Sequence, residues 1–139
     1  MKPGSRITRA AAPSLSIAML GMLAPPIAPA LSASDGVAAH VVITNSFRFE
    51  PSQVTIHAGE AIEWTNQSHF KHTVTDDPKM AGQPVDAALP AEAQAFTSDE
   101  IPAGGSYRRK LTVPGAYRYF CMPHEGIGML GKILVLPGD

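Results

Sequence analysis

The chain contains very little cysteine, because Cys121 is the single one among 139 residues. One cysteine excludes an internal disulfide, and a structural zinc site usually needs several cysteines in paired spacing. A thiol nucleophile requires a base and an orienting partner, and His124 could supply only the base. A lone thiol in an oxidising compartment is open to oxidation unless it is bound to a partner such as a metal ion. Cys121 is therefore a candidate metal ligand.

Basic residues and long apolar runs are also scarce. Lys and Arg number eleven against twelve Asp and Glu, and three of the basic residues precede Asp35, which leaves a net charge of −4 from there on. The absence of a basic stripe argues against nucleic acid and anionic membrane surfaces as partners. The mainly apolar stretch at residues 10–23 is only about 14 residues long, which is too short for a membrane span, so we expect no stable membrane insertion.

Acidic residues are missing from the first 34 residues altogether. Basic residues come first in this segment, the apolar stretch follows, and small residues with prolines end it, which is the order of a secretory signal peptide. We predict a signal peptide over residues 1–33, cleaved after Ala30 or Ala33, and an exported periplasmic domain over residues 34–139. A retained N-terminal anchor or an organellar transit peptide stays open as an alternative.

The segment after the signal shows short strands separated by turns. Alternating or β-branched runs recur, and proline and glycine punctuate them. These runs lie at residues 40–46, 53–57, 61–66, 72–75, 106–113, 116–121 and 131–136. Residues 77–100 lack alternation, so we expect a long connection between sheets with one helical turn near residues 91–95. About seven short strands indicate an all-β sandwich or barrel.

Three kinds of metal-ligating side chain lie close together near the C-terminus, in the stretch CMPHEGIGM. Cys121 ends one predicted strand, Met129 stands just before the next, and His124 lies between them. Pro123 and two glycines force this connection to turn tightly, so the three donors can point to one spot.

A fourth donor has to come from elsewhere, and the chain offers His40, His57, His69 and His72. His72 begins a predicted strand and can be held rigidly beside Cys121, whereas His69 lies inside an exposed loop. Two imidazoles, one thiolate and a weaker thioether are the donor set of a blue-copper electron-transfer centre. Copper binding also deprotonates the thiol, which explains how a solitary cysteine survives export.

Other copper centres lack their required parts. A multicopper oxidase flanks its cysteine with histidines that pass electrons to further coppers, and here the neighbours are Phe120 and Met122. A binuclear copper centre needs a second cysteine.

The stretch GAYRYFCMPHEGIGMLGKILV resembles the copper-binding loop and last strand of the cupredoxins, of the plastocyanin and pseudoazurin type. GEAIEWTNQSHFKHTVT, further upstream, resembles the family's other ligand strand. The resemblance implies a Greek-key β-sandwich of about seven to eight strands, one type 1 copper and one-electron transfer between larger redox proteins. It also implies three strong ligands and one long axial thioether, which are His72, Cys121, His124 and Met129.

The chain departs from the family pattern beside these ligands. Lys71 and Thr73 stand where the family usually has Pro and Asn around the first ligand histidine. The Thr73 backbone N–H can still reach the cysteine sulfur, but the side-chain brace of Asn between the two ligand loops is lost or replaced by a hydroxyl. Phe120 stands where plastocyanins commonly have Tyr. A second docking site for redox partners beside a tyrosine side chain is therefore not expected.

Docking is expected at the second ligand histidine. In the family the edge of this imidazole reaches the surface inside an apolar patch, which here implies His124 with Met122, Pro123 and Ile127 around it. A small apolar patch suits brief docking of a redox donor and a redox acceptor, and we expect a monomer. The acidic clusters formed by Asp76, Asp77, Asp99 and Glu100 are expected to be solvated loop residues.

The sequence therefore predicts a soluble electron carrier that is not an enzyme, because no substrate is transformed. The rival hypothesis is a copper-binding storage, delivery or resistance protein with a cupredoxin fold. Delivery sites tend to be methionine-rich and open, whereas this chain offers one candidate methionine and a closed loop. A third hypothesis is a structural β-sandwich that binds no metal, in which case the spacing of the candidate ligands would be a coincidence.

Overall fold

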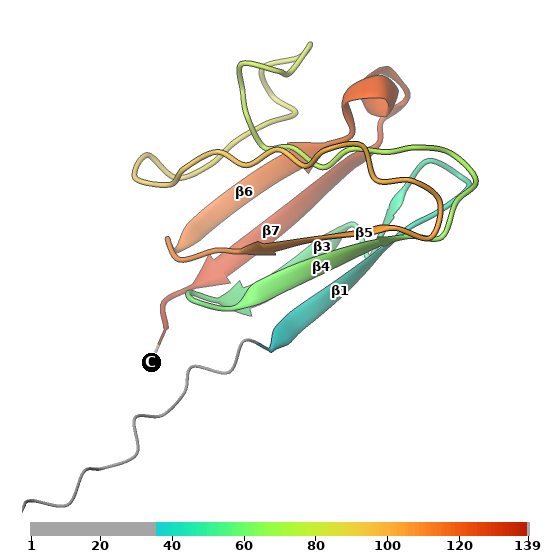
Figure 1. Ribbon diagram of the computed structural model, residues 1–139. Coiled ribbons are helices and arrows are strands. Elements are labelled where there is room, and N and C mark those ends of the chain that lie inside the picture. Colours follow the sequence, from blue (N-terminus) through green and yellow to red (C-terminus); the bar gives the residue numbers. More distant parts are fainter. Residues whose placement is uncertain (1–35, 139) are drawn as a thin grey trace, which may run out of the picture. The chain divides into compact units, whose positions relative to one another are not determined.

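The computed structural model describes residues 36–138. The predicted signal peptide, residues 1–33, and its cleavage sites lie outside the described residues. Within the described range seven strands form two sheets that face each other (Figure 1). The all-β sandwich predicted from the sequence is confirmed.

One sheet has four strands in the order β2-β1-β4-β5, and the other has three in the order β3-β7-β6. The first comprises β1 (Val37–Ile43), β2 (Phe49–Glu50), β4 (Ala61–Asn66) and β5 (Ser106–Lys110). The second comprises β3 (Gln53–His57), β6 (Gly115–Phe120) and β7 (Leu130–Leu136). The β1–β4 and β3–β7 pairs are parallel, so crossovers between the sheets bring distant parts of the chain together.

The core lies between the sheets, because the strands bury alternate side chains there. In β3, for example, Val54 and Ile56 are buried and the residues between and beside them are exposed. Trp64 of β4 and Tyr119 of β6 belong to different sheets, and their rings meet edge to face with centroids 5.5 Å apart. Gly131 of β7 lies against the Tyr119 ring, where any Cβ would overlap the phenol.

Most predicted strands are present with boundaries shifted by a few residues, and those at 53–57 and 61–66 match in full. Residues 72–75 do not form the continuous strand that was predicted. They pair only through isolated bridges, at His72 with Ile101 and at Thr75 with Thr97 and Phe120. This segment crosses the end of the sandwich and takes its backbone partners from loops as well as from β6.

The helical turn predicted near residues 91–95 is absent, and a single turn closes there when the Ala93 N–H donates to the Pro90 carbonyl. A 3₁₀ helix that was not predicted, η1 (Met122–Ile127), lies between β6 and β7. No helix in residues 36–138 is long and apolar enough to cross a membrane.

Candidate metal centre

The connection between β6 and β7 folds as one closed loop from Cys121 to Met129. The Cys121 N–H donates to the Met129 carbonyl at 3.1 Å, and the Met129 N–H donates to the His124 carbonyl at 3.3 Å. Pro123 sits in the first turn of η1, and Gly128 ends the helix with a left-handed backbone, φ +81°. The short loop thereby holds three predicted ligands in fixed relation to β6 and β7.

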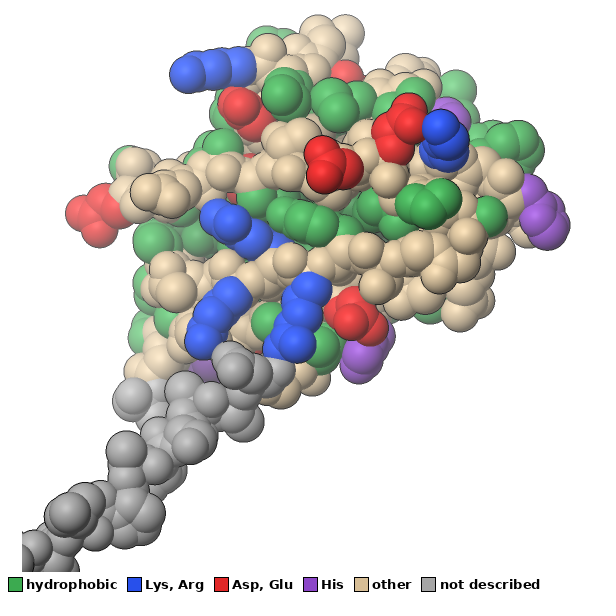
Figure 2. Space-filling model, viewed as in Figure 1, with side chains coloured by type: hydrophobic (Ala, Val, Ile, Leu, Met, Phe, Trp, Pro, Cys, Tyr) green, Lys and Arg blue, Asp and Glu red, His purple; other side chains and the backbone are tan. Residues whose placement is uncertain are grey.

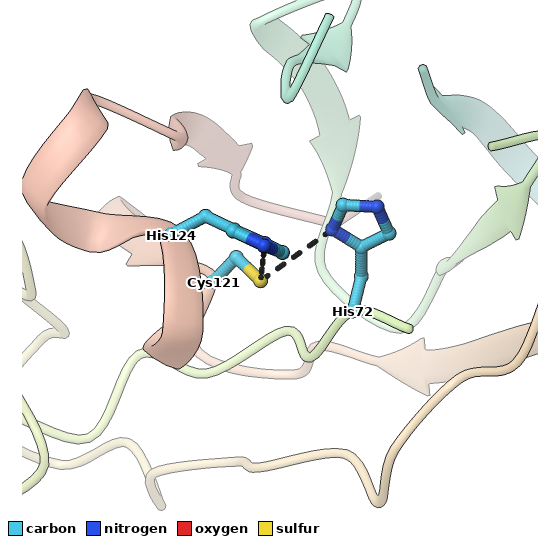
Figure 3. A group of neighbouring side chains, drawn as sticks. All are labelled: His72, Cys121 and His124. Atoms are coloured by element: carbon cyan, nitrogen blue, oxygen red, sulfur yellow. Dashed lines mark hydrogen bonds between the residues drawn. The ribbon is translucent and has the colours of Figure 1, made fainter. Parts of the chain in front are cut away.

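The fourth predicted ligand, His72, reaches the same place from the bridge with Ile101. The Cys121 Sγ lies 3.7 Å from His72 Nδ1 and 3.3 Å from His124 Nδ1. Figure 3 shows the sulfur and the two imidazole rings facing one another. The donor atoms of these three residues all lie within 4.8 Å of one another. Met129 is fully buried directly before β7. Of the four predicted ligands the structure thus gathers three donor atoms in one cluster and places the fourth residue at the end of the same loop.

Burial sets the protonation of this cluster. It lowers the pKa of His72, with the charge of His124 adding to the effect, and it also lowers the pKa of His124 itself. Burial raises the pKa of the Cys121 thiol, although the backbone N–H and the hydroxyl of Thr73 oppose that rise. Both imidazoles are therefore neutral near pH 7, with free lone pairs, and a metal that binds here must displace the thiol proton.

The ring of His72 is oriented by a chain of hydrogen bonds. His72 Nε2 lies 2.7 Å from Ser68 Oγ, which in turn donates to Asn66 Oδ1 at 2.8 Å. The Asn66 amide donates to the carbonyls of Phe70 and Ile101 at 2.7 and 2.9 Å, so it cannot turn freely. When Nδ1 serves as a metal donor, Nε2 carries the proton and donates to Ser68. This chain fixes both the tautomer and the orientation of the ring.

A comparison with protein families decides what this arrangement is. The family model described as copper binding proteins, plastocyanin/azurin family, matches residues 37–136. The chain belongs to this family. Copper was the cofactor predicted from the sequence. The copper-binding family and the His72, Cys121 and His124 cluster confirm it.

Individual relatives agree with the family assignment. The chloroplastic plastocyanin of Tetradesmus obliquus is 40% identical over 87 residues, which are 63% of this chain and 57% of that protein. The plastocyanin of Scenedesmus fuscus is 41% identical over 87 residues, 63% of this chain and 85% of that protein. The match thus spans little more than half the length of the first relative.

Solved structures support the same fold. Amicyanin from Paracoccus versutus is 28% identical, with a TM-score of 0.53 over 75% of this chain and 88% of the amicyanin. A purple cupredoxin from Nitrosopumilus maritimus has a TM-score of 0.58 at 20% identity, over 70% of this chain and 99% of its own, and supports the fold alone.

Thr73 braces the two ligand segments of this cupredoxin. Its backbone N–H donates to the Cys121 Sγ at 3.3 Å, as the sequence suggested. Its hydroxyl accepts the Met122 N–H at 2.9 Å and lies 3.8 Å from the same sulfur. Of the two outcomes considered for the missing Asn, the structure shows replacement by a hydroxyl.

Phe47, which sequence reasoning missed, packs on the metal centre from the loop between β1 and β2. Its ring centroid lies 4.6 Å from that of His124 and 5.1 Å from that of Phe70. Phe47 has a positive φ of 56°, a conformation unusual for a bulky residue. The sequence TNSFR indicates a turn. No local pattern predicts that this turn places an aromatic ring against His124, which lies 77 residues later in the chain.

Glu125, also missed, connects the loop 77–100 to the ligand loop of the cupredoxin. Its two carboxylate oxygens accept the N–H groups of Gly82 and Gln83 at 2.9 and 3.0 Å. These bonds lower the pKa of Glu125, so the carboxylate stays ionised. The residue next to His124 therefore anchors a long connection that the sequence predicts only as irregular.

The remaining histidines lie away from the cluster, as expected. His69 is exposed, and its backbone N–H donates to Asn45. His40 and His57 are exposed strand residues beside the carboxylates of Glu63 and Glu60.

Proposed function

We propose that this cupredoxin is a one-electron carrier whose copper is bound by His72, Cys121, His124 and Met129. The observation that carries the proposal is the position of the Cys121 sulfur, between the Nδ1 atoms of two neutral histidines. Copper supplies the Cu(II)/Cu(I) couple, for which thiolate and thioether favour the reduced ion and imidazole suits both. Zinc is disfavoured by the donor set, because structural zinc sites rely on several cysteines.

The protein part of the mechanism is to keep the donors still. His72 is held through Ser68, and the Cys121 sulfur is held by Thr73. His124 and Met129 are fixed within one hydrogen-bonded loop. Donors that do not move when the charge of the metal changes keep the rearrangement for electron transfer small, which suits a carrier.

His124 supplies the route for the electron. It is the one member of the three-residue cluster that is not fully buried. Around it Met122 is 38% exposed and Ile127 is 65% exposed, and Pro123 is also exposed. These are the patch residues predicted from the sequence. A redox donor and acceptor would dock here briefly, because small apolar contacts form and release quickly.

We further propose that the carrier works as a monomer in an exported compartment, the periplasm. Support comes from the order of basic, apolar and small residues in the first 33 positions. The carrier transforms no substrate and is therefore not an enzyme. Storage, delivery or resistance fits less well, because Cys121 and His72 are buried and the loop around them is closed.

The test is to add Cu(II) to the purified protein and record its visible spectrum. An intense blue thiolate-to-copper band is expected, Cys121→Ser abolishes it, and the exposed control Met122→Leu retains it. A colourless wild type contradicts the ligand assignment. Voltammetry then separates the two functions, because a reversible one-electron wave supports a carrier and loss of copper on reduction supports delivery.

A further inference from the structure

A carboxyl group is buried in the core beyond the metal centre. Asp76 is 0% exposed, although the sequence indicated a solvated loop. The reason is a backbone pairing with Phe96, in which the Asp76 N–H donates to the Phe96 carbonyl at 3.1 Å. The Phe96 N–H donates in turn to Asp76 Oδ1 at 2.7 Å. The other oxygen, Oδ2, is buried and has no hydrogen-bond partner among the described residues.

The groups around Asp76 neutralise it only in part. Basic side chains gather over β5 on the face shown in Figure 2, and Arg109 of β5 extends over the Phe96 ring, 5.7 Å from its centroid. Arg109 attracts the carboxylate, but its buried Nε has no hydrogen-bond partner in the described range. The neighbouring Asp77 repels the carboxylate, and the phenols of Tyr107 and Tyr117 are within its electrostatic influence.

A buried carboxylate that lacks a full set of partners is costly, and the cost is avoided when the group takes up a proton. Burial raises the pKa of Asp76 to about 6, against the opposing Phe96 N–H and Arg109. Asp76 therefore changes charge near physiological pH, which an ordinary aspartate does not do.

Asp76 lies on the same segment as one of the proposed metal ligands, His72. It follows His72 by four residues, which corresponds to roughly 13 Å in an extended chain. Its neighbour Thr75 exchanges two backbone hydrogen bonds with Phe120, the residue before Cys121, at 3.1 and 2.9 Å. Charges at such a separation interact appreciably when protein rather than water lies between them.

We propose that Asp76 is a buried proton-binding site coupled to the copper centre. Reduction of the metal by a donor redox protein would make the binding of a proton from solvent to the Asp76 carboxylate more favourable, and loss of the electron would make the return of that proton to solvent more favourable. The inference rests on the proposed function, because the metal has to change charge. Coupling is reciprocal, so the proton favours reduction as much as reduction favours the proton.

A cavity lies on the β5 side of the core, close to groups that interact with Asp76. Arg109 and Tyr117, both influenced by the charge of Asp76, line this cavity of about 350 Å³ together with loop residues that include Glu92. The cavity brings solvent to two side chains that interact electrostatically with Asp76, although Asp76 itself does not line it.

Two measurements test the inference. In the metal-free protein, ¹³C NMR of the Asp76 carboxyl should show a titration midpoint well above the ordinary aspartate value of about 3.9. In the copper protein, the reduction potential should fall as the pH rises through this midpoint. Asp76→Asn should remove that inflection, whereas Asp99→Asn, the same change at an exposed site, should leave it. The wild type and both variants keep the same ligand histidines. Any proton uptake at these histidines therefore cancels when the variants are compared with the wild type.

The outcomes are separable. An ordinary Asp76 midpoint, or the same inflection in Asp76→Asn, overturns the inference. If Asp76→Asn does not fold, Arg109→Gln serves instead, because loss of the cation should move the inflection to higher pH, and an unmoved inflection overturns the inference. A protein that binds no copper overturns the proposed function and the coupling together, whereas the metal-free titration still shows whether Asp76 binds a proton.

Discussion

Phe47 packs its ring on the metal centre although its backbone adopts a strained, left-handed conformation. Its left-handed conformation places the ring against His124 and Phe70. This conformation costs a residue with a Cβ roughly 1–2 kcal/mol, and glycine avoids the cost. The contact between the rings offsets the strain, so the loop between β1 and β2 is held by the site that it covers.

The strain predicts an unusual order of stability. Phe47→Gly and Phe47→Ala both lose the ring contact, but only the glycine relieves the backbone. We expect Phe47→Gly to be more stable than Phe47→Ala by about 1 kcal/mol in urea unfolding. At the neighbouring Ser46, which lacks a positive φ, the alanine variant should be the more stable one. An alanine variant of Phe47 that matches or exceeds the glycine variant would show that the strain is absent.

Ser68 acts on the metal through His72. Ser68→Ala removes the partner of His72 Nε2 and leaves the ring free to change tautomer and tilt. Loss of such an outer partner typically lowers metal affinity about 10- to 100-fold, and we expect a loss in this range in competition titrations with a copper chelator. Ser106→Ala, at an exposed position of β5, is the control and should bind as the wild type does. Equal affinities of the two variants would contradict the orienting role.

At the scale of elements, the loop 77–100 depends on the ligand loop for its anchorage. Glu125→Gln replaces one of the two accepting oxygens by an amide that cannot accept a hydrogen bond. We expect the Gly82 and Gln83 amides to exchange with deuterium faster, whereas Glu92→Gln, an exposed residue of the same connection, should leave them unchanged. Unaltered exchange in Glu125→Gln would mean that the connection is held elsewhere.

The strands and the ligand loop were predictable because their signals are local. Alternation marks β3 and β4 within a few residues, and the spacing of Cys121, His124 and Met129 lies within one loop. The contribution of Glu125 depends on a partner about forty residues away, which single-sequence patterns do not encode. The same holds for segment 72–75, whose alternating pattern gave a strand although its partners are separate bridges.

At the scale of the whole molecule, the raised pKa of Asp76 makes stability depend on pH. The folded protein holds this proton up to about pH 6, and the unfolded chain loses it near pH 3.8. Stability from this group is therefore complete below pH 3.8 and is lost as the pH rises to about 6. At about 1.4 kcal/mol per pKa unit, the loss is on the order of 3 kcal/mol.

The measurement is urea unfolding of the metal-free wild type and Asp76→Asn between pH 4 and pH 7. The difference between the two proteins isolates Asp76 from the other titrating groups. We expect the wild type to lose stability relative to Asp76→Asn across this range. A difference that is independent of pH would mean that Asp76 titrates alike in the folded and unfolded chains.

Copper binding should stabilise the whole sandwich, because its proposed donors come from the loop that connects β6 to β7 and from the separate segment at His72. A ligand present at 100 times its Kd adds about 2.7 kcal/mol to the free energy of unfolding. The midpoint of thermal unfolding should therefore rise with added copper in the wild type and stay fixed in Cys121→Ser. Equal shifts in both proteins would indicate binding elsewhere on the chain.

His72 and Cys121 are 49 residues apart along the chain, so copper binding at this centre also reports on the formation of a long-range contact during folding. Contacts between residues so distant in sequence require the closure of a long loop and therefore form slowly. Blue colour that develops during refolding in the presence of copper would thus mark the formation of this long-range contact, and it could be followed by eye without any attached dye.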